Sequence, residues 1–192
     1  MVYEQTRGQI TDGDLLFFRG RLLHSRIIQR WSRSVFSHVG IAHWIRSAGV
    51  ERLAVVEAIE GHGVRLYPLS VSLERGDDVD WFQITDDSIA GDRVVGWAMA
   101  RWGKRYATAR QFVRSFLSIR LATWLGLPTR LADDRWFCSW FAAEALRAGG
   151  WQPPDDDTIR PELAAPGDVA LFSCIQRKGP LRLSMDSDED SR

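Results

Sequence analysis

The sequence has little of what marks a secreted, disulfide-bonded or membrane-spanning protein. It contains only two cysteines, Cys138 and Cys174, which are too few for a disulfide framework, so we expect both to be reduced. No stretch approaches the roughly 18 apolar residues that a membrane helix needs. Residues 1–10 lack the apolar segment of a secretory signal peptide. We therefore expect a chain without a signal peptide or transmembrane helix, cytoplasmic by default.

The chain also lacks net charge. Its 25 lysines and arginines equal its 25 aspartates and glutamates, and no nucleic-acid-binding motif is present, so nucleic acid is not an expected partner. The balance conceals two opposed segments, because residues 74–92 carry seven acids and one base whereas residues 101–135 carry eight bases and two acids. Aromatic residues alternate with the bases of residues 101–135. We expect this basic, aromatic segment to help determine the substrate.

Length and composition suit a single α+β domain. A chain of 192 residues that is 45% hydrophobic can bury a substantial core. We assign residues 1–180 to this domain and expect the polar, acidic residues 181–192 to be disordered. Short apolar or alternating runs predict strands at 15–18, 35–45, 53–59, 64–67, 79–84 and 169–174. Helical spacing and helix-start signals predict helices at 86–102 and 105–124, and a third helix that has Cys138 in its first turn and stops at Gly149.

Cys138 is a candidate nucleophile because of its place in a predicted helix. Apolar residues recur from Cys138 at helical spacing until Gly149, which puts the cysteine in the first turn. There the positive end of the helix dipole and the unpaired N–H groups stabilise a thiolate over a thiol. This position is therefore one at which a cysteine becomes reactive.

A cysteine nucleophile also needs a base, and the base needs a polar partner. Of the four histidines, His38 fits best because it lies in a predicted strand, where its ring would keep a fixed separation from the sulfur. Glu57 is the acid in an otherwise apolar strand, and a lone carboxylate seldom occupies such a position without a partner. We therefore expect Glu57 to orient the His38 ring.

Each of these residues also has an ordinary structural explanation. Cys138 could be a small core residue, His38 a satisfied strand histidine, and Glu57 a solvated residue at a sheet edge. Cys174 ends a predicted strand and is expected in the core. A zinc site would have to combine His38, His43 and a cysteine, but the sequence has neither a Cys-x-x-Cys pair nor a His-Glu-x-x-His motif. We expect no metal and no organic cofactor.

Four short sequence blocks follow one another in an informative order. They are Gly13-Asp-Leu-Leu-Phe-Phe18, Phe36-Ser-His-Val-Gly-Ile41, Val55-Val-Glu-Ala58 and Phe137-Cys-Ser-Trp140. Together they resemble the NlpC/P60 superfamily of papain-like cysteine peptidases, over about residues 13–150. In ordinary members the cysteine block comes first. Here it comes last, as in the circularly permuted branch that includes the YiiX-like and YaeF-like proteins and, more distantly, the lecithin retinol acyltransferase relatives.

The resemblance implies a permuted papain-like fold and a set of site residues. The fold would be an antiparallel sheet or small barrel packed on helices, with the cysteine at a helix N-terminus and the histidine on a strand. The implied catalytic residues are Cys138 as nucleophile, His38 as general base and Glu57 as the residue that orients His38. Their neighbours in the motifs are expected to line the site, namely Ser37, Ser139 and Trp140.

Tyr106 is a further site-lining residue that the resemblance implies. Gly103-Lys-Arg-Tyr106 matches the first part of a Gly-x-x-Tyr-Asp segment that precedes the cysteine helix in the family, although Ala107 replaces the aspartate. Tyr106 would line the site or donate a hydrogen bond to an oxyanion. A tyrosine in such a Trp-rich region is otherwise explained by packing.

The function that the resemblance implies is a thiol hydrolase that cleaves amide or ester bonds. Its substrate would be a cell-wall peptide or a lipid or aminoacyl amide, in a protein of bacterial or phage origin. Two alternatives stay open: a catalytically idle papain-like binding or structural module, for example in a phage particle, and an acyltransferase on the same triad. Residues 110–124 could cover the substrate or contact a membrane surface, or form a core helix whose arginines reach water.

Overall fold

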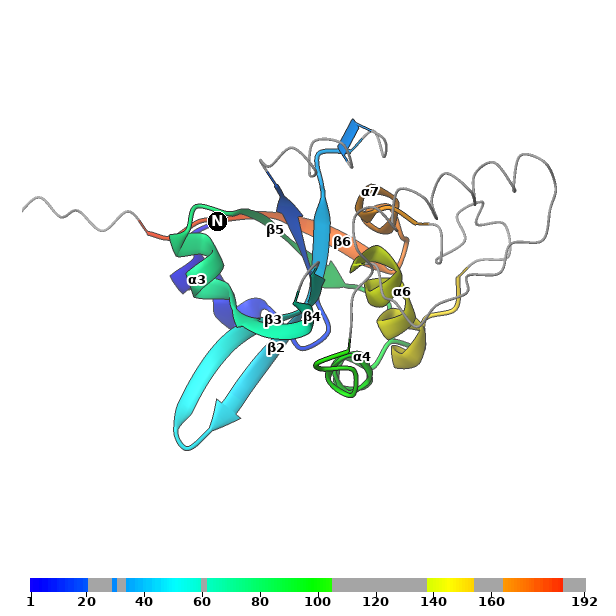
Figure 1. The fold of residues 1–192 in the computed structure, drawn as a ribbon, viewed down its shortest axis with the longest axis horizontal. Coiled ribbons are helices and arrows are strands. Elements are labelled where there is room, and N and C mark those ends of the chain that lie inside the picture. Colours follow the sequence, from blue (N-terminus) through cyan, green and yellow to red (C-terminus); the bar gives the residue numbers. More distant parts are fainter. Residues whose placement is uncertain (21–28, 31–33, 60–61, 105–137, 154–163, 185–192) are drawn as a thin grey trace, which may run out of the picture.

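The computed structural model describes residues 1–20, 29–30, 34–59, 62–104, 138–153 and 164–184. These residues form an α+β fold around one six-stranded antiparallel sheet (Figure 1). The predicted fold class is confirmed at this level. The helix expected at 105–124, with the proposed lid or membrane contact at 110–124, lies outside the described residues.

The sheet has the strand order β4-β3-β2-β1-β5-β6. Its strands are β1 (Leu15–Arg19), β2 (His38–Ser47), β3 (Val50–Ile59), β4 (Gly63–Pro68), β5 (Asp78–Ile84) and β6 (Ile175–Leu181). The first five cover the runs expected from the sequence, with shifted ends. The largest shift is in β2, which begins at His38 rather than at residue 35 and continues to Ser47. Ala48 and Gly49, both at positive φ, then make the tight turn into β3.

Helices cover both faces of the sheet. They are α1 (Tyr3–Thr6), the 3-10 helix η1 (Arg7–Gln9), α3 (Leu69–Glu74), α4 (Gly91–Met99), α6 (Cys138–Gly149) and α7 (Pro166–Val169). Figure 1 shows α4, α6 and α7 on one side of the sheet and α3 on the other. No helix in the described part of the chain is long and apolar enough to cross a membrane.

Each face of the sheet carries its own apolar core, as the period of two along a strand requires. In β1, Leu15 and Phe17 pack with α4 and α6, whereas Leu16 and Phe18 pack with residues of α1 and α3. All four side chains are buried, and each contributes roughly 1.5–3 kcal/mol of transfer free energy. The uninterrupted apolar run at 15–18 therefore marks a strand covered on both faces.

The last strand was predicted at the wrong residues. The sequence suggested a strand at 169–174, but Pro166–Val169 forms α7 and β6 occupies Ile175–Leu181. Pro166 stands at the start of α7, where the N–H group that proline lacks has no intrahelical acceptor. Residues 176–178 of β6 are polar and exposed, because β6 is an edge strand.

The helix predicted at 86–102 is shorter than expected, because α4 covers only Gly91–Met99. Asp86 does not cap it. Its carboxylate instead accepts hydrogen bonds from the backbone N–H and the hydroxyl of Ser88, at 2.9 and 2.6 Å, and so closes a turn ahead of the helix. The residue that precedes the helix is Ala90.

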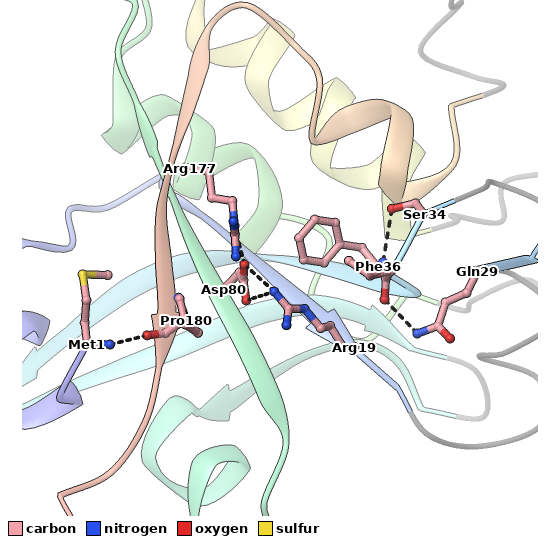
Figure 2. A network of polar contacts seen from close by, with 9 residues as sticks. Met1, Arg19, Gln29, Ser34, Phe36, Asp80, Arg177 and Pro180 are labelled. Carbon is pink, nitrogen blue, oxygen red and sulfur yellow. Dashed lines mark hydrogen bonds and ion pairs between the residues drawn. The ribbon is translucent and has the colours of Figure 1, made fainter.

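A buried carboxylate holds three strands together at the β6 side of the sheet (Figure 2). Asp80 of β5 is fully buried and meets Arg19 of β1 at 2.8 Å and Arg177 of β6 at 2.6 Å. The Arg19 guanidinium also lies 5.6 Å from the centre of the Phe36 ring. A buried carboxylate is costly without such partners, so these two arginines make the position tolerable.

Residues 181–184, which were assigned to a disordered tail, have defined partners. Leu181 ends β6, and Arg182 forms a parallel bridge with Val2. The Tyr3 N–H donates to the Arg182 carbonyl at 2.7 Å, and the Arg182 N–H donates to the Met1 carbonyl at 3.0 Å. The beginning and the end of the described chain therefore lie side by side. Residues 185–192 lie outside the described residues.

Candidate functional site

The structure brings Cys138, His38 and Glu57 together at one end of the sheet. His38 is the first residue of β2, Glu57 lies near the end of β3, and Cys138 is the first residue of α6. These positions arise from three separate parts of the sequence, and the sheet register and the packing of α6 unite them. His38 lies on a strand, and Cys138 begins the described part of α6.

Glu57 holds the His38 ring by a short hydrogen bond. The distance from His38 Nε2 to Glu57 Oε2 is 2.7 Å. The Glu57 side chain is 5% exposed and the His38 side chain 18% exposed, so the pair is shielded while the ring keeps some access to solvent. Because Nε2 is occupied by Glu57, Nδ1 is the ring nitrogen that remains for Cys138.

Gly40 leaves the room that Glu57 needs. A Cβ atom at this position would lie 2.3 Å from Val55 Cγ1 and 3.3 Å from Glu57 Cβ. Any larger residue would therefore push β3 and its carboxylate away from His38. The close approach of β3 therefore explains why a glycine stands two residues after His38.

The Cys138 side chain forms a hydrogen bond with His38 and determines much of its charge. Burial by itself would lower the pKa of His38. The hydrogen bond and charge of Cys138, followed by those of Glu57, outweigh burial and raise that pKa to about 10. With its pKa raised to about 10, the His38 ring carries its proton at neutral pH.

Cys138 also belongs to the apolar core. It is 7% exposed and packs within the cluster that contains Phe141 and Ala142 of α6. The core position that was the ordinary structural explanation of Cys138 is therefore observed. Gly149, at the other end of α6, allows the helix to approach α4 closely, since a Cβ there would lie 2.4 Å from Val94 Cγ2.

Arg65 is a site residue that the sequence did not reveal. It lies on β4 directly opposite Glu57. Its Nε and Nη2 donate to Glu57 Oε1 at 2.9 and 2.8 Å. Burial would raise the pKa of Glu57, but His38 and then Arg65 lower it below its ordinary value. Glu57 is therefore ionised and has both of its oxygens engaged.

The other expected site residues have different outcomes. Ser37 is buried, and its hydroxyl accepts the Gly20 N–H at 2.8 Å and donates to the Phe18 carbonyl at 3.3 Å, so it braces the entry to β2. Ser139 is buried and Trp140 is partly buried on α6. Tyr106 lies outside the described residues.

The two histidines considered as zinc ligands do not lie close together. His38 and His43 stand five residues apart on β2, which is roughly 16 Å along a strand and on opposite faces. His43 Nδ1 pairs instead with Asp12 at 3.2 Å. Within the described ranges, no group of three or more His, Cys, Asp or Glu residues is arranged to hold a metal ion. Cys174 is buried in the core, as expected.

No protein-family profile and no curated protein sequence matches this chain. Among solved structures, the fold is similar to the crystal structure of YiiX from Escherichia coli O157:H7, which is described as a metalloprotein. The match has a TM-score of 0.59 and 18% sequence identity, and covers 88% of this chain and 96% of that chain. At this identity the likeness establishes a YiiX-like fold.

Proposed function

We propose that this chain is a thiol hydrolase in which Cys138 attacks an amide or ester carbonyl. The observation that carries the proposal is the chain of contacts from Cys138 to His38 to Glu57, with the cysteine at the start of a helix. Such a series of nucleophile, imidazole and orienting carboxylate is the arrangement that covalent acyl transfer requires. The permuted papain-like relationship that the sequence blocks suggest belongs to the same proposal.

The charge state of His38 indicates which group carries the transferred proton in the first half of the proposed reaction. Because the pKa of His38 is raised to about 10, the ring already carries its proton at neutral pH. In the proposed mechanism Cys138 is the thiolate partner of this imidazolium. The sulfur forms a bond to the carbonyl carbon, and the carbon–nitrogen or carbon–oxygen bond breaks. His38 gives its proton to the departing atom, which leaves a thioester on Cys138 and a neutral imidazole.

Water completes the cycle. The neutral His38 takes a proton from a water molecule, whose oxygen attacks the thioester carbon. The carbon–sulfur bond breaks, the acid is released, and the thiolate–imidazolium pair is restored. In this proposal the oxyanion is stabilised by backbone N–H groups in the first turn of α6, because they belong to the same turn as Cys138 and the positive end of the helix dipole lies there.

A metal mechanism does not suit these residues. Glu57 uses one oxygen for His38 and the other for the Arg65 guanidinium, whose positive charge opposes a divalent cation at the same carboxylate. The proposal therefore routes no step through a metal.

Iodoacetamide labelling at pH 7 tests the proposed nucleophile, with Cys174 as an internal control. Both cysteines are buried, at 7% and 2% exposure. A thiol of ordinary pKa is only a few per cent ionised at this pH, so a stabilised Cys138 thiolate should label at least about tenfold faster than Cys174. Peptide mapping by mass spectrometry measures both rates in the same molecule.

His38→Ala should slow the labelling of Cys138 and leave that of Cys174 unchanged. Hydrolysis of an activated ester by the wild-type protein should show an initial burst, which Cys138→Ala abolishes. Equal labelling of the two cysteines, or ester hydrolysis that survives Cys138→Ala, would instead identify a papain-like scaffold. Transfer of the acyl group to an added amine in preference to water would identify an acyltransferase.

A further inference from the structure

The contacts of Glu57 point beyond the three residues of the proposed triad. Its carboxylate is divided between two strands, because Oε2 meets His38 of β2 and Oε1 meets Arg65 of β4. The two donors of Arg65 converge on a single oxygen, at 2.9 Å from Nε and 2.8 Å from Nη2. This grip fixes the rotation of the carboxylate, and hence the direction in which Oε2 points.

Arg65 is itself held in place. Its guanidinium lies over the Tyr67 ring at 4.6 Å from the centre, on the same strand face. Arg75, which follows α3, approaches the same ring at 5.4 Å. Arg65 is only about a quarter exposed, at 28% of its side chain. Because the Arg65 side chain is stacked and mostly buried, it loses little further conformational freedom when it holds Glu57.

Several elements of the described chain contribute titratable or charged groups around the His38–Glu57 pair. Cys138 of α6 interacts with His38, and Arg65 of β4 interacts with Glu57. Arg75 and Asp77 lie between α3 and β5 and interact with each other. Asp77 interacts with both Glu57 and His38 through charge. Of these groups, His38 and Arg65 are the two that form hydrogen bonds with Glu57.

We propose that Arg65 is a positioning residue of this site, which keeps Glu57 ionised and turned toward His38. The inference rests on the proposed roles of His38, Glu57 and Cys138, and it adds a fourth member that acts through Glu57 without touching the substrate. It gives the site a continuous series of contacts from the sulfur through imidazole and carboxylate to guanidinium.

Two explanations of the role of Arg65 predict opposite changes in the pKa of His38 when Arg65 is replaced. If Arg65 acted only as a positive charge near an imidazolium, its removal would relieve repulsion and raise the pKa of His38. If Arg65 positions Glu57, its removal frees the carboxylate to rotate or to take up a proton, and the pKa of His38 falls. The direction of the change therefore decides between the two.

The experiment is an NMR titration of the His38 ring in the full chain, in the wild type and in Arg65→Met. We expect the pKa of His38 to fall by about one unit or more, the range that loss of one close ionic partner produces. Arg65→Lys keeps the charge but loses the paired donors, so it should give a smaller fall. If circular dichroism shows that Arg65→Met does not fold, the titration of Arg65→Lys tests the proposal in its place.

Arg75→Met is the matched control, because it removes a guanidinium from the same tyrosine ring at a residue with no hydrogen bond to Glu57. It should leave the pKa of His38 within a few tenths of a unit of the wild type. In a Glu57→Gln background, Arg65→Met should have no further lowering effect. A pKa of His38 that is unchanged or raised in Arg65→Met would overturn the proposal.

The labelling of Cys138 separates this inference from the proposed function. Slow labelling in the wild type would count against the hydrolase, whereas the His38 titration would still report whether Arg65 positions Glu57. Conversely, fast and His38-dependent labelling combined with an unchanged titration in Arg65→Met would uphold the hydrolase and remove Arg65 from its machinery.

Discussion

Cys138 and Glu57 act together on the charge of His38. Burial by itself would lower the pKa of the ring, but the hydrogen bonds and charges of Cys138 and Glu57 outweigh it and raise that pKa to about 10. In the proposed mechanism, acylation of the Cys138 sulfur removes one of these two supports for the proton on His38, at the point where the leaving group needs that proton.

The same coupling predicts how stability depends on pH. The pKa of His38 is raised in the folded state, so its contribution is full below about 6.5 and is lost as the pH rises through about 10. The pKa of Glu57 is lowered, so its contribution is present above its ordinary value and is lost as the pH falls. The pair thus stabilises the fold most from mildly acidic to mildly alkaline pH.

Glu57→Gln should lower the free energy of unfolding by about 2 kcal/mol near pH 7, the cost of losing charge-assisted hydrogen bonds. The loss should shrink above pH 9, where the wild type itself gives up the His38 proton. Urea unfolding of both proteins under reducing conditions, from pH 5 to pH 10.5, measures the difference. A constant difference across this range would show that the His38 charge does not contribute to stability.

At the residue scale, the sequence pointed to candidate site residues whose signals are local and do not require the strand register. Cys138 followed from helical spacing, and Glu57 from its isolation in an apolar strand. Arg65 was missed because an arginine eight residues after a glutamate has no local signal. The pairing of Glu57 with Arg65 follows once Ile59 pairs with Gly63, and that register is a property of the sheet.

Among the elements, the seam between β1, β5 and β6 depends on one carboxylate. Asp80 is fully buried, whereas its partners Arg19 and Arg177 are 34% and 51% exposed. Removing the carboxylate would leave two guanidinium groups without their shared acceptor. Removing Arg177 would leave Asp80 still paired with Arg19. The carboxylate is therefore the sensitive member of the network.

Asp80→Asn should lower the free energy of unfolding by about 3 kcal/mol, the lower range for breaking a buried ion pair. Arg177→Met should cost about 1 kcal/mol or less, because half of its side chain is exposed to water. Urea denaturation followed by circular dichroism compares the two variants. Equal losses would contradict the assignment of the carboxylate as the common anchor.

Sequence patterns predicted the covered elements better than the edges. The apolar run of β1 is unambiguous because both of its faces are buried. An edge strand such as β6 has polar, exposed residues in its middle, so neither a continuous apolar run nor a clean alternation marks it. The preceding run at 169–174 is apolar for another reason, since Val169, Phe172 and Cys174 pack into the core beside α6.

For the whole molecule, the order of blocks along the chain matters less than their positions in space. The proposed nucleophile comes from residue 138 and the other site residues from residues 38–65, yet packing unites them. The fold likeness to YiiX covers 88% of this chain and concerns the α+β architecture alone. Sequence could indicate this order but could not supply the interior distances, which depend on register and on the approach of α6 to α4.

A circular permutant tests whether order along the chain is dispensable. Residues 184 and 1 can be joined by a linker of about six residues, since Arg182 already bonds to Met1 and Tyr3 and a strand rises about 3.3 Å per residue. New ends within residues 105–137 would put Cys138 ahead of His38. We expect the permutant to fold and to label Cys138 at a rate within about tenfold of the parent. A folded permutant whose Cys138 labels as slowly as Cys174 would show that the site requires the native connection.

The bridge between Val2 and Arg182 also has a mechanical consequence. The two segments run parallel, and reciprocal hydrogen bonds join Tyr3 to Arg182 and Arg182 to Met1. A tension applied through the chain before Val2 and after Arg182 would pull the segments along their length in opposite directions. The tension would act on these hydrogen bonds simultaneously, in shear, and would not break them one after another. The fold should therefore resist being stretched by its ends more than its marginal thermal stability would suggest.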